Sequence, residues 1–244
     1  MRTLRRPDLL IFDCDGVLID SQAIQCRVDA AVLTRLGYAI TAEDVGRKFI
    51  GVSTQAMVRH VEGLLGRPLP ITFEAERDRL VDAAYRRELK AVEGVGAAIA
   101  ALGLRVCVAS NAQTDRLHHA LRQTGLSQLF TPHIFGADLV ARPKPEPDLF
   151  FFCAERMRVA RAACLVIEDS VTGVRAAVAA GMPVVGFYGG SHCFEGYERL
   201  LLEAGADAVC RDMADLAALV ALPERGAPAA RSPSSTANKW NTPW

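Results

Sequence analysis

The sequence predicts an α/β protein with a parallel sheet, interrupted after its first strand by an all-helical insertion. Two observations carry this prediction. From residue 91 onward, short apolar runs alternate with helical stretches of roughly 10 to 15 residues, a pattern typical of a parallel sheet wound with right-handed crossovers. Residues 21–90 contain helical patterns and no strand candidate. The strand that precedes them must therefore join the same sheet as the strands that follow.

The first strand is expected over the apolar run Leu9-Leu10-Ile11-Phe12, with Asp13, Cys14, Asp15 and Gly16 directly after it. Side chains alternate along a strand, so both aspartates project to one side and Cys14 to the other, into the core. Open α/β sheets place their active sites at the carboxyl ends of such strands. Two acids there repel each other, which favours a cation between them. The alternative is an aspartate-rich turn with no further role.

The insertion is expected to hold several helices. Ser21 can cap the first, and Gly37 ends it; Ser53 can cap a later one. The predicted helices cover residues 21–36, a short stretch opening at 41, 53–65 and 73–89.

The remainder alternates strands with helices. The predicted strands are 104–109, 133–135, 163–167, 183–187 and 208–210, and the predicted helices are 94–102, 113–124, 148–157, 171–180 and 213–222. This organisation gives a Rossmann-like sheet core from residues 1–20 and 91–223, and an all-helical insertion from 21–90. Residues 224–244 are rich in Pro, Ala, Ser and Thr and are expected to be a disordered tail.

Composition narrows the functional classes. Lys plus Arg equals Asp plus Glu at 28 each, which argues against a nucleic-acid or polybasic membrane partner. No run of apolar residues is long enough to cross a membrane. The seven cysteines form no C-x-x-C pair, so we expect reduced, buried thiols and a cytoplasmic protein.

Polar residues follow three later strands. Ser110 and Asn111 follow one, Glu168 and Asp169 follow another, and Lys144 lies in a loop between two prolines. In a parallel sheet these positions converge on the edge that carries Asp13. The set suits phosphoryl transfer to a carboxylate nucleophile, with Mg²⁺ offsetting the charge repulsion. Taken singly, Ser110 could be a helix cap, Lys144 a solvated turn residue, and the acids a charged helix start.

Four segments together resemble the motifs of the haloacid dehalogenase-like (HAD) hydrolases. They are Asp13–Asp20, Ser110-Asn111, Lys144-Pro145 and Ile167–Ser170. The resemblance implies the HAD fold, with residues 21–90 as its helical cap, and an Mg²⁺-dependent phosphatase acting on a small phosphorylated metabolite. It implies catalytic roles for Asp13 as nucleophile, Asp15 as acid/base, and Ser110 and Lys144 as phosphate ligands, and a metal site among Asp13, Asp15, Glu168 and Asp169.

Within that family the chain is most similar to the group of β-phosphoglucomutase and phosphoglycolate phosphatase, and closest to sugar-phosphate phosphatases of the 6-phosphogluconate type. The mutases carry a histidine and an arginine where this chain has Gln25 and Thr54. A hydrolase of a sugar or sugar-acid phosphate is therefore expected, as a monomer or weak homodimer. A phosphosugar mutase and a non-catalytic phosphometabolite-binding protein are the alternatives. The expected substrate-binding residues are Asn111, Gln25, Arg27, Phe49, Gly51, Thr54 and Arg142.

The histidines have no obvious role. His118 and His119 are adjacent on a predicted helix and face about 100° apart, so they do not share a metal readily. His60, His133 and His192 lack ligand spacing and are expected at the surface or in packing. The glycine-rich stretch 186–190 is expected to be a loop near the site.

Overall fold

The computed structural model describes residues 6–220. Its centre is a parallel sheet of six strands in the order β3-β2-β1-β4-β5-β6. The first strand along the chain therefore lies in the middle of the sheet, as its uniformly apolar sequence requires. The strands are β1 (Leu9–Phe12), β2 (Arg105–Ala109), β3 (Ile134–Phe135), β4 (Cys164–Glu168), β5 (Val184–Phe187) and β6 (Ala208–Cys210).

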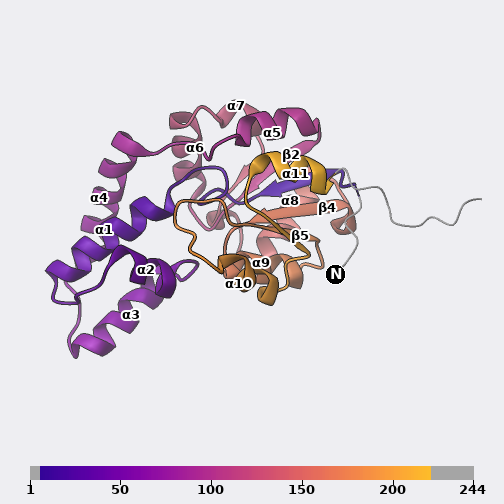
Figure 1. The fold of residues 1–244 in the computed structure, drawn as a ribbon. Helices are drawn as coiled ribbons and strands as arrows, with labels where there is room; N and C mark the ends of the chain where they lie inside the picture. The colour runs from indigo at the N-terminus through magenta and orange to yellow at the C-terminus, as the bar shows by residue number, and fades with distance from the viewer. Residues whose placement is uncertain (1–5, 221–244) are drawn as a thin grey trace, which may run out of the picture.

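Of the five helices between β1 and β2 in the sequence, the first four stand together to one side of the sheet (Figure 1). They are α1 (Gln22–Arg35), α2 (Ala42–Phe49), α3 (Thr54–Leu65) and α4 (Phe73–Glu88). We call these helices and the segments that connect them, residues 21–90, the helical insert. The other helices are α5 (Val95–Leu102), α6 (Thr114–Gln123), α7 (Ser127–Phe130), α8 (Asp148–Met157), α9 (Val171–Ala179), α10 (Tyr197–Ala204) and α11 (Met213–Val220). Two short 3₁₀ turns cover Ala137–Leu139 and Arg161–Ala163.

The sheet is buried on both faces, which explains why β1 is apolar at every position. Leu10 and Phe12 pack with residues of α5, α6 and α11, whereas Leu9 and Ile11 pack with residues of α8, α9 and α10. Cys14 is fully buried on the same face as Phe12, so the predicted alternation holds. Removing any of these fully buried side chains would cost roughly 2 to 5 kcal/mol through lost burial and the cavity left behind.

The helical insert has a hydrophobic core of its own, built from α1, α3 and α4. Its buried members are Val32, Leu33, Met57, Val61, Leu69 and Phe73. The chain enters and leaves the insert at one place, because an isolated antiparallel bridge pairs Ile19 with Ala91. The Asp20 amide donates to the Lys90 carbonyl at 2.9 Å, and the Val92 amide donates to the Leu18 carbonyl at 2.9 Å.

Three features differ from the sequence prediction. Helix α10 was not predicted, although Tyr197 and Leu201 on one face of it are buried; the glycines before it favoured a loop reading. The short α7 was missed for lack of a full period. Ser21 is the residue before α1, but its side chain makes no capping hydrogen bond and donates to Asp15 instead.

The predicted tail, 224–244, lies outside the described residues. Within residues 6–220, no helix is long and apolar enough to cross a membrane.

Candidate active site

The strand register brings the predicted residues together. Phe12 pairs with Val108 of β2 and with Ile167 of β4. One residue further along, Asp13 therefore lies between Ala109 and Glu168, at the carboxyl edge of the sheet. Ser110 follows β2 at the same edge and is 2% exposed. Its hydroxyl accepts from the Ala112 amide at 3.1 Å, so the side chain is fixed from the start of the loop before α6.

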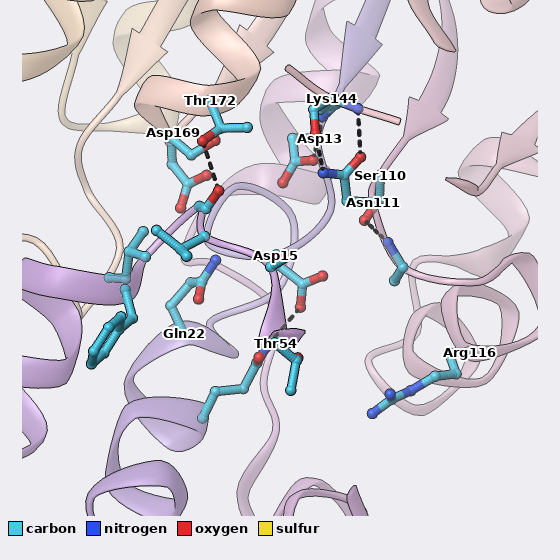
Figure 2. Close-up of a pocket in the computed structure, with 18 of the residues that line it drawn as sticks. Asp13, Asp15, Gln22, Thr54, Ser110, Asn111, Arg116, Lys144, Asp169 and Thr172 are labelled. Carbon is cyan, nitrogen blue, oxygen red and sulfur yellow. Dashed lines mark hydrogen bonds and ion pairs between the residues drawn. The ribbon is translucent and has the colours of Figure 1, made fainter. Parts of the chain in front are cut away.

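Lys144 lies beside Asp13 at this edge (Figure 2). Its Nζ donates to Asp13 Oδ1 at 2.7 Å, to Glu168 Oε2 at 2.7 Å and to the Ala109 carbonyl at 2.8 Å. All three protons of the ammonium group are engaged, and its side chain is 3% exposed. Burial alone would lower the pKa of Lys144, but the Asp13 and Glu168 carboxylates outweigh it and raise that pKa above its usual range.

Asn111 holds the Lys144 loop in place. Its Oδ1 accepts from the Lys144 amide at 3.0 Å, and its Nδ2 donates to the Lys144 carbonyl at 3.0 Å. Both ends of the side-chain amide are therefore occupied by one residue of the neighbouring loop. Asn111 was expected to bind substrate; it lines the cavity, but these bonds position the lysine.

Three carboxylates form an acidic cluster beside the lysine. Asp13, Glu168 and Asp169 each offer an oxygen, and these oxygens lie within 4.8 Å of one another. Glu168 also accepts from the Ser170 hydroxyl at 2.8 Å and from the Ser170 amide at 3.1 Å, so it bridges Lys144 to the start of α9. Asp15, which the resemblance offered as a further ligand, is not a member of this cluster in the part of the chain that the structure describes.

Asp169 is the least satisfied member of the cluster. Both its carboxylate oxygens are buried and lack a hydrogen-bond partner within the described residues. His192 Nε2 lies 3.1 Å from Asp169 Oδ2, but not in hydrogen-bond geometry. On the other side, a Cβ at Gly16 would meet Asp169 Oδ2 at 1.9 Å, so only glycine fits there, and its φ of +82° also suits glycine.

The acidic cluster is electrostatically unsatisfied. Burial raises the pKa of Asp13 well above its ordinary value, Glu168 raises it further, and Lys144 opposes the rise. Burial also raises the pKa of Asp169 to about 6, although His192 acts against it. One ammonium group faces three carboxylates, so a bound cation would stabilise their charged forms.

The donor set fits a hard divalent cation. Carboxylate oxygens are the ligands that Mg²⁺ prefers. The two unpartnered oxygens of Asp169 point to a missing partner, since buried polar groups are normally bonded. The cluster could therefore hold a divalent metal ion.

Asp15 is bound by residues that lie outside the sheet. The Ser21 hydroxyl donates to Asp15 Oδ1 at 2.5 Å, and Gln25 Nε2 lies 3.4 Å from the same oxygen. Gln25 Nε2 also donates to the Tyr85 hydroxyl at 2.7 Å. Burial raises the pKa of Asp15, while the Ser21 hydrogen bond and the Arg116 charge oppose the rise. The helical insert thus holds this carboxylate, whereas the sheet edge holds Asp13.

A cavity of about 830 Å³ lies between the sheet edge and the helical insert. Of the residues expected to bind substrate, the insert contributes Gln25, Phe49, Gly51 and Thr54 to its lining. The Thr172 hydroxyl, at the start of α9, donates to the Gly51 carbonyl at 2.7 Å and ties the insert to the core, as Figure 2 shows.

Two expected substrate-binding arginines lie elsewhere. Arg27 Nη2 lies 2.5 Å from Glu88 Oε2 on the surface of the insert. Arg142 Nη2 lies 2.8 Å from Asp148 Oδ1, on an exposed loop. Neither lines the cavity, and each is paired with a local carboxylate that the motif comparison did not consider.

Sequence reasoning missed three residues at the site. The side chain of His192 is 1% exposed and faces Asp169, although the sequence favoured a surface or packing role. Tyr85 bonds Gln25, and Arg116 lines the cavity. Each reaches the site from a helix or loop without a motif of its own. Ser21 carried a signal, a hydroxyl at the end of the first motif, but it was assigned to helix capping.

The parallel sheet, the carboxylates at its carboxyl edge and the single helical insert define an α/β enzyme of the HAD type. The chain belongs to the haloacid dehalogenase-like hydrolase family, whose model matches residues 10–187. The resemblance drawn from the four motifs is confirmed, and so is the predicted fold class.

Named relatives agree with this assignment. The chain is 31% identical over 194 residues to the 6-phosphogluconate phosphatase of Escherichia coli, covering 78% of this chain and 86% of the relative. A solved HAD-like protein of unknown function from Agrobacterium tumefaciens is 40% identical, with a TM-score of 0.83, over 88% of this chain and 97% of the other. A HAD family hydrolase from Deinococcus radiodurans, solved with bound phosphate and sodium, is 31% identical, with a TM-score of 0.73, over 88% of this chain and 97% of the other.

Proposed function

We propose that the protein is an Mg²⁺-dependent phosphomonoester hydrolase that acts on a small phosphorylated sugar or sugar acid. The observation that carries the proposal is the cluster of Asp13, Lys144, Glu168 and Asp169 at the base of the cavity. The phosphatase names of relatives support it, including the 6-phosphogluconate phosphatase of E. coli. We place the enzyme in the cytoplasm, as a monomer or weak homodimer.

In this proposal, the substrate phosphate lies against Asp13. The Ser110 hydroxyl donates to one of its oxygens, and the positive charge of the Lys144 ammonium group beside Asp13 attracts the others. Both side chains are already fixed by the bonds described above. Asp13 and Asp169 would hold Mg²⁺ with Glu168 beside them, and the ion would offset the repulsion between carboxylate and phosphate. Pre-positioned charges of this kind cost no reorganisation during the reaction.

The reaction then proceeds in two displacements. A carboxylate oxygen of Asp13 bonds to phosphorus, the ester P–O bond breaks, and Asp15 gives its proton to the leaving alcohol oxygen. Asp15, now charged, takes a proton from water, whose oxygen bonds to the phosphorus of the aspartyl phosphate. The acyl-phosphate P–O bond breaks, which releases inorganic phosphate and restores the Asp13 carboxylate. The raised pKa of Asp15 suits the first of these proton transfers.

The helical insert would act as the cap of this site, with residues 1–20 and 91–223 as the catalytic core. The insert supplies Gln25 and Thr54 to the cavity wall, and Ser21, which leads into α1, bonds Asp15. When the insert closes on the core, water other than the attacking molecule is excluded.

The test is release of inorganic phosphate by the purified protein, with and without Mg²⁺. The substrates are 6-phosphogluconate, sorbitol 6-phosphate, glucose 1-phosphate and p-nitrophenyl phosphate. We expect Mg²⁺-dependent release from at least one sugar substrate, and its loss in Asp13→Asn, a variant that keeps the shape of the side chain.

Formation of glucose 6-phosphate from glucose 1-phosphate, without phosphate release, would instead identify a mutase. Binding of a phosphorylated sugar without turnover would identify a non-catalytic binding protein. Either result overturns the proposal.

A further inference from the structure

Arg116 is a half-exposed cation at the boundary between the core and the insert. It lies in the first turn of α6 of the core, faces α4 of the insert, and lines the cavity. Its Nη2 lies 3.4 Å from Asp82 Oδ1 and its Nη1 lies 3.8 Å from Asp78 Oδ2. These contacts are long, and the Arg116 side chain is 45% exposed. The guanidinium group is therefore oriented by two carboxylates but not saturated by them.

Two other cations of the cavity have other partners. Lys144 donates to Asp13, Glu168 and Ala109, and the proposed function places the substrate phosphate beside it. Arg77 forms a buried two-point pair with Asp29, with its Nε 2.5 Å from Oδ1 and its Nη2 3.1 Å from Oδ2. Arg86 also lines the cavity, from the insert side. Unlike Arg77 and Arg86, which belong to α4 of the insert, Arg116 belongs to α6 of the core, which also carries the catalytic cluster. Its distance from that cluster therefore does not depend on the position of the insert.

The position of Arg116 fits the far end of a substrate. In the view of Figure 2, Asp15 lies between Arg116 and the pair Asp13 and Lys144. With the phosphate against Lys144 and the leaving oxygen at Asp15, the rest of the substrate extends toward Arg116. A guanidinium group recognises planar carboxylates through two parallel hydrogen bonds.

The surrounding charge favours a carboxylate over a second phosphate. Asp82 and Asp115 line the cavity near Arg116, and Asp78 lies just beyond. These acids repel any anion, and they repel a phosphate dianion about twice as strongly as a carboxylate, which carries one charge.

We propose that Arg116 binds the carboxylate of a phosphorylated sugar acid and selects this substrate class over neutral phosphosugars. The proposal rests on the phosphatase function above and narrows it. When substrate binds, Nη1 and Nη2 of Arg116 leave their long contacts with Asp78 and Asp82 and donate to the substrate carboxylate.

The test compares 6-phosphogluconate with sorbitol 6-phosphate, which has the same carbon chain but a hydroxymethyl group in place of the carboxylate. Charge-assisted hydrogen bonds contribute roughly 1.5 to 3 kcal/mol, so we expect kcat/KM to favour the acid by about 10- to 100-fold. In Arg116→Met this preference should vanish, because kcat/KM for the acid should fall further than kcat/KM for sorbitol 6-phosphate. Arg116→Lys should keep part of the preference, since it retains the charge but not the fork.

Arg86→Met is the matched control, because it removes the same charge from the same cavity. We expect it to keep the preference for the acid. If Arg86→Met loses the preference as fully as Arg116→Met, the cavity charge as a whole selects the substrate and the assignment is wrong. If the enzyme prefers fructose 1,6-bisphosphate over fructose 6-phosphate by more than it prefers the acid over the alditol, the site binds phosphate and the assignment is also wrong.

The double variant Asp78→Asn, Asp82→Asn tests whether Arg116 binds the substrate or only links α6 of the core to α4 of the insert. If Arg116 only fastens the insert to the core, this variant should lower kcat/KM for both substrates as Arg116→Met does. If Arg116 binds substrate, the double variant should keep the preference for the acid. Failure of every substrate to be hydrolysed would overturn the proposed function itself. Asp13-dependent hydrolysis without an acid preference would overturn this inference alone.

Discussion

The sheet side and the insert side of the cavity differ in how firmly their polar groups are held. On the sheet side, the Lys144 side chain is 3% exposed and its Nζ has three acceptors within 2.8 Å. Where the insert meets the core, Arg116 of α6 is 45% exposed and contacts carboxylates of the insert at 3.4 and 3.8 Å. Rigid placement suits the groups that act on the phosphate, which is common to all substrates. Looser placement suits groups that bind the rest of the substrate, which differs from one substrate to another.

Asp15 belongs to both sides, since the sheet carries it and the insert bonds it, so its loss should have the largest effect. For Asp15→Ala, we expect kcat on a sugar phosphate to fall by roughly 10² to 10⁴-fold, because an alkoxide leaves without a proton donor. With p-nitrophenyl phosphate, whose leaving group needs no proton, rapid mixing should still show a burst of nitrophenolate. Unchanged kcat on the sugar phosphate would contradict the assignment.

Lys144→Met removes the ion pairs that hold the sheet side of the cavity together. Removing the ammonium group leaves Asp13 and Glu168 as buried, unpaired carboxylates, and breaking such a pair costs roughly 3 to 5 kcal/mol. We expect urea unfolding to show this loss and phosphate release to be abolished. Adding Glu168→Gln should recover part of the stability without recovering activity. A single variant as stable as the parent chain would show that the cluster is not held by Lys144.

Mg²⁺ should raise the unfolding free energy of the chain by binding to the acidic cluster on the sheet side. An ion bound to the folded chain alone raises the unfolding free energy by about 2.7 kcal/mol at a concentration 100 times its dissociation constant. The measurement is the thermal midpoint with Mg²⁺ against Na⁺ at equal ionic strength. Asp169→Asn should remove most of the shift, because it alters the two unpartnered oxygens. An equal shift in that variant would place the ion elsewhere.

Thr172→Val should have the smallest effect, since it removes one bond between the two sides. The hydroxyl donates to the Gly51 carbonyl at 2.7 Å, and such a bond contributes roughly 0.5 to 1.5 kcal/mol. We expect KM for a sugar phosphate to rise a few-fold with little change in kcat. Thr172→Ser, which keeps the hydroxyl, is the control. A large fall in kcat would mean that this contact also positions the catalytic groups.

The sheet side could be predicted from sequence because its signals are local. Asp13, Ser110 and Glu168 each follow a short apolar strand, and parallel strands bring such positions to one edge. The lysine needed the motif comparison as well, because its loop does not follow a strand directly: a 3₁₀ turn lies between β3 and the loop.

The insert side could not be predicted as well, because its contacts depend on how helices face one another. Arg27 and Arg116 look alike as charged helix residues, yet one pairs with Glu88 at the surface and the other reaches the cavity. His192 faces Asp169 from a loop whose path depends on β5 and α10. Ser21 was assigned a backbone partner, but its hydroxyl bonds Asp15 instead.

The bridge between Ile19 and Ala91 has a consequence for how this architecture can diversify. Because the two ends of the insert are hydrogen-bonded side by side, the intervening chain is a closed loop whatever its length. The entropy of closing a loop grows only with the logarithm of its length, so a doubling adds about 0.6 kcal/mol. Helices could therefore be lengthened, added or exchanged between these two points without altering the register of the sheet. Exchanging the insert for another helical segment can therefore change substrate specificity, while the catalytic strands keep their sequence.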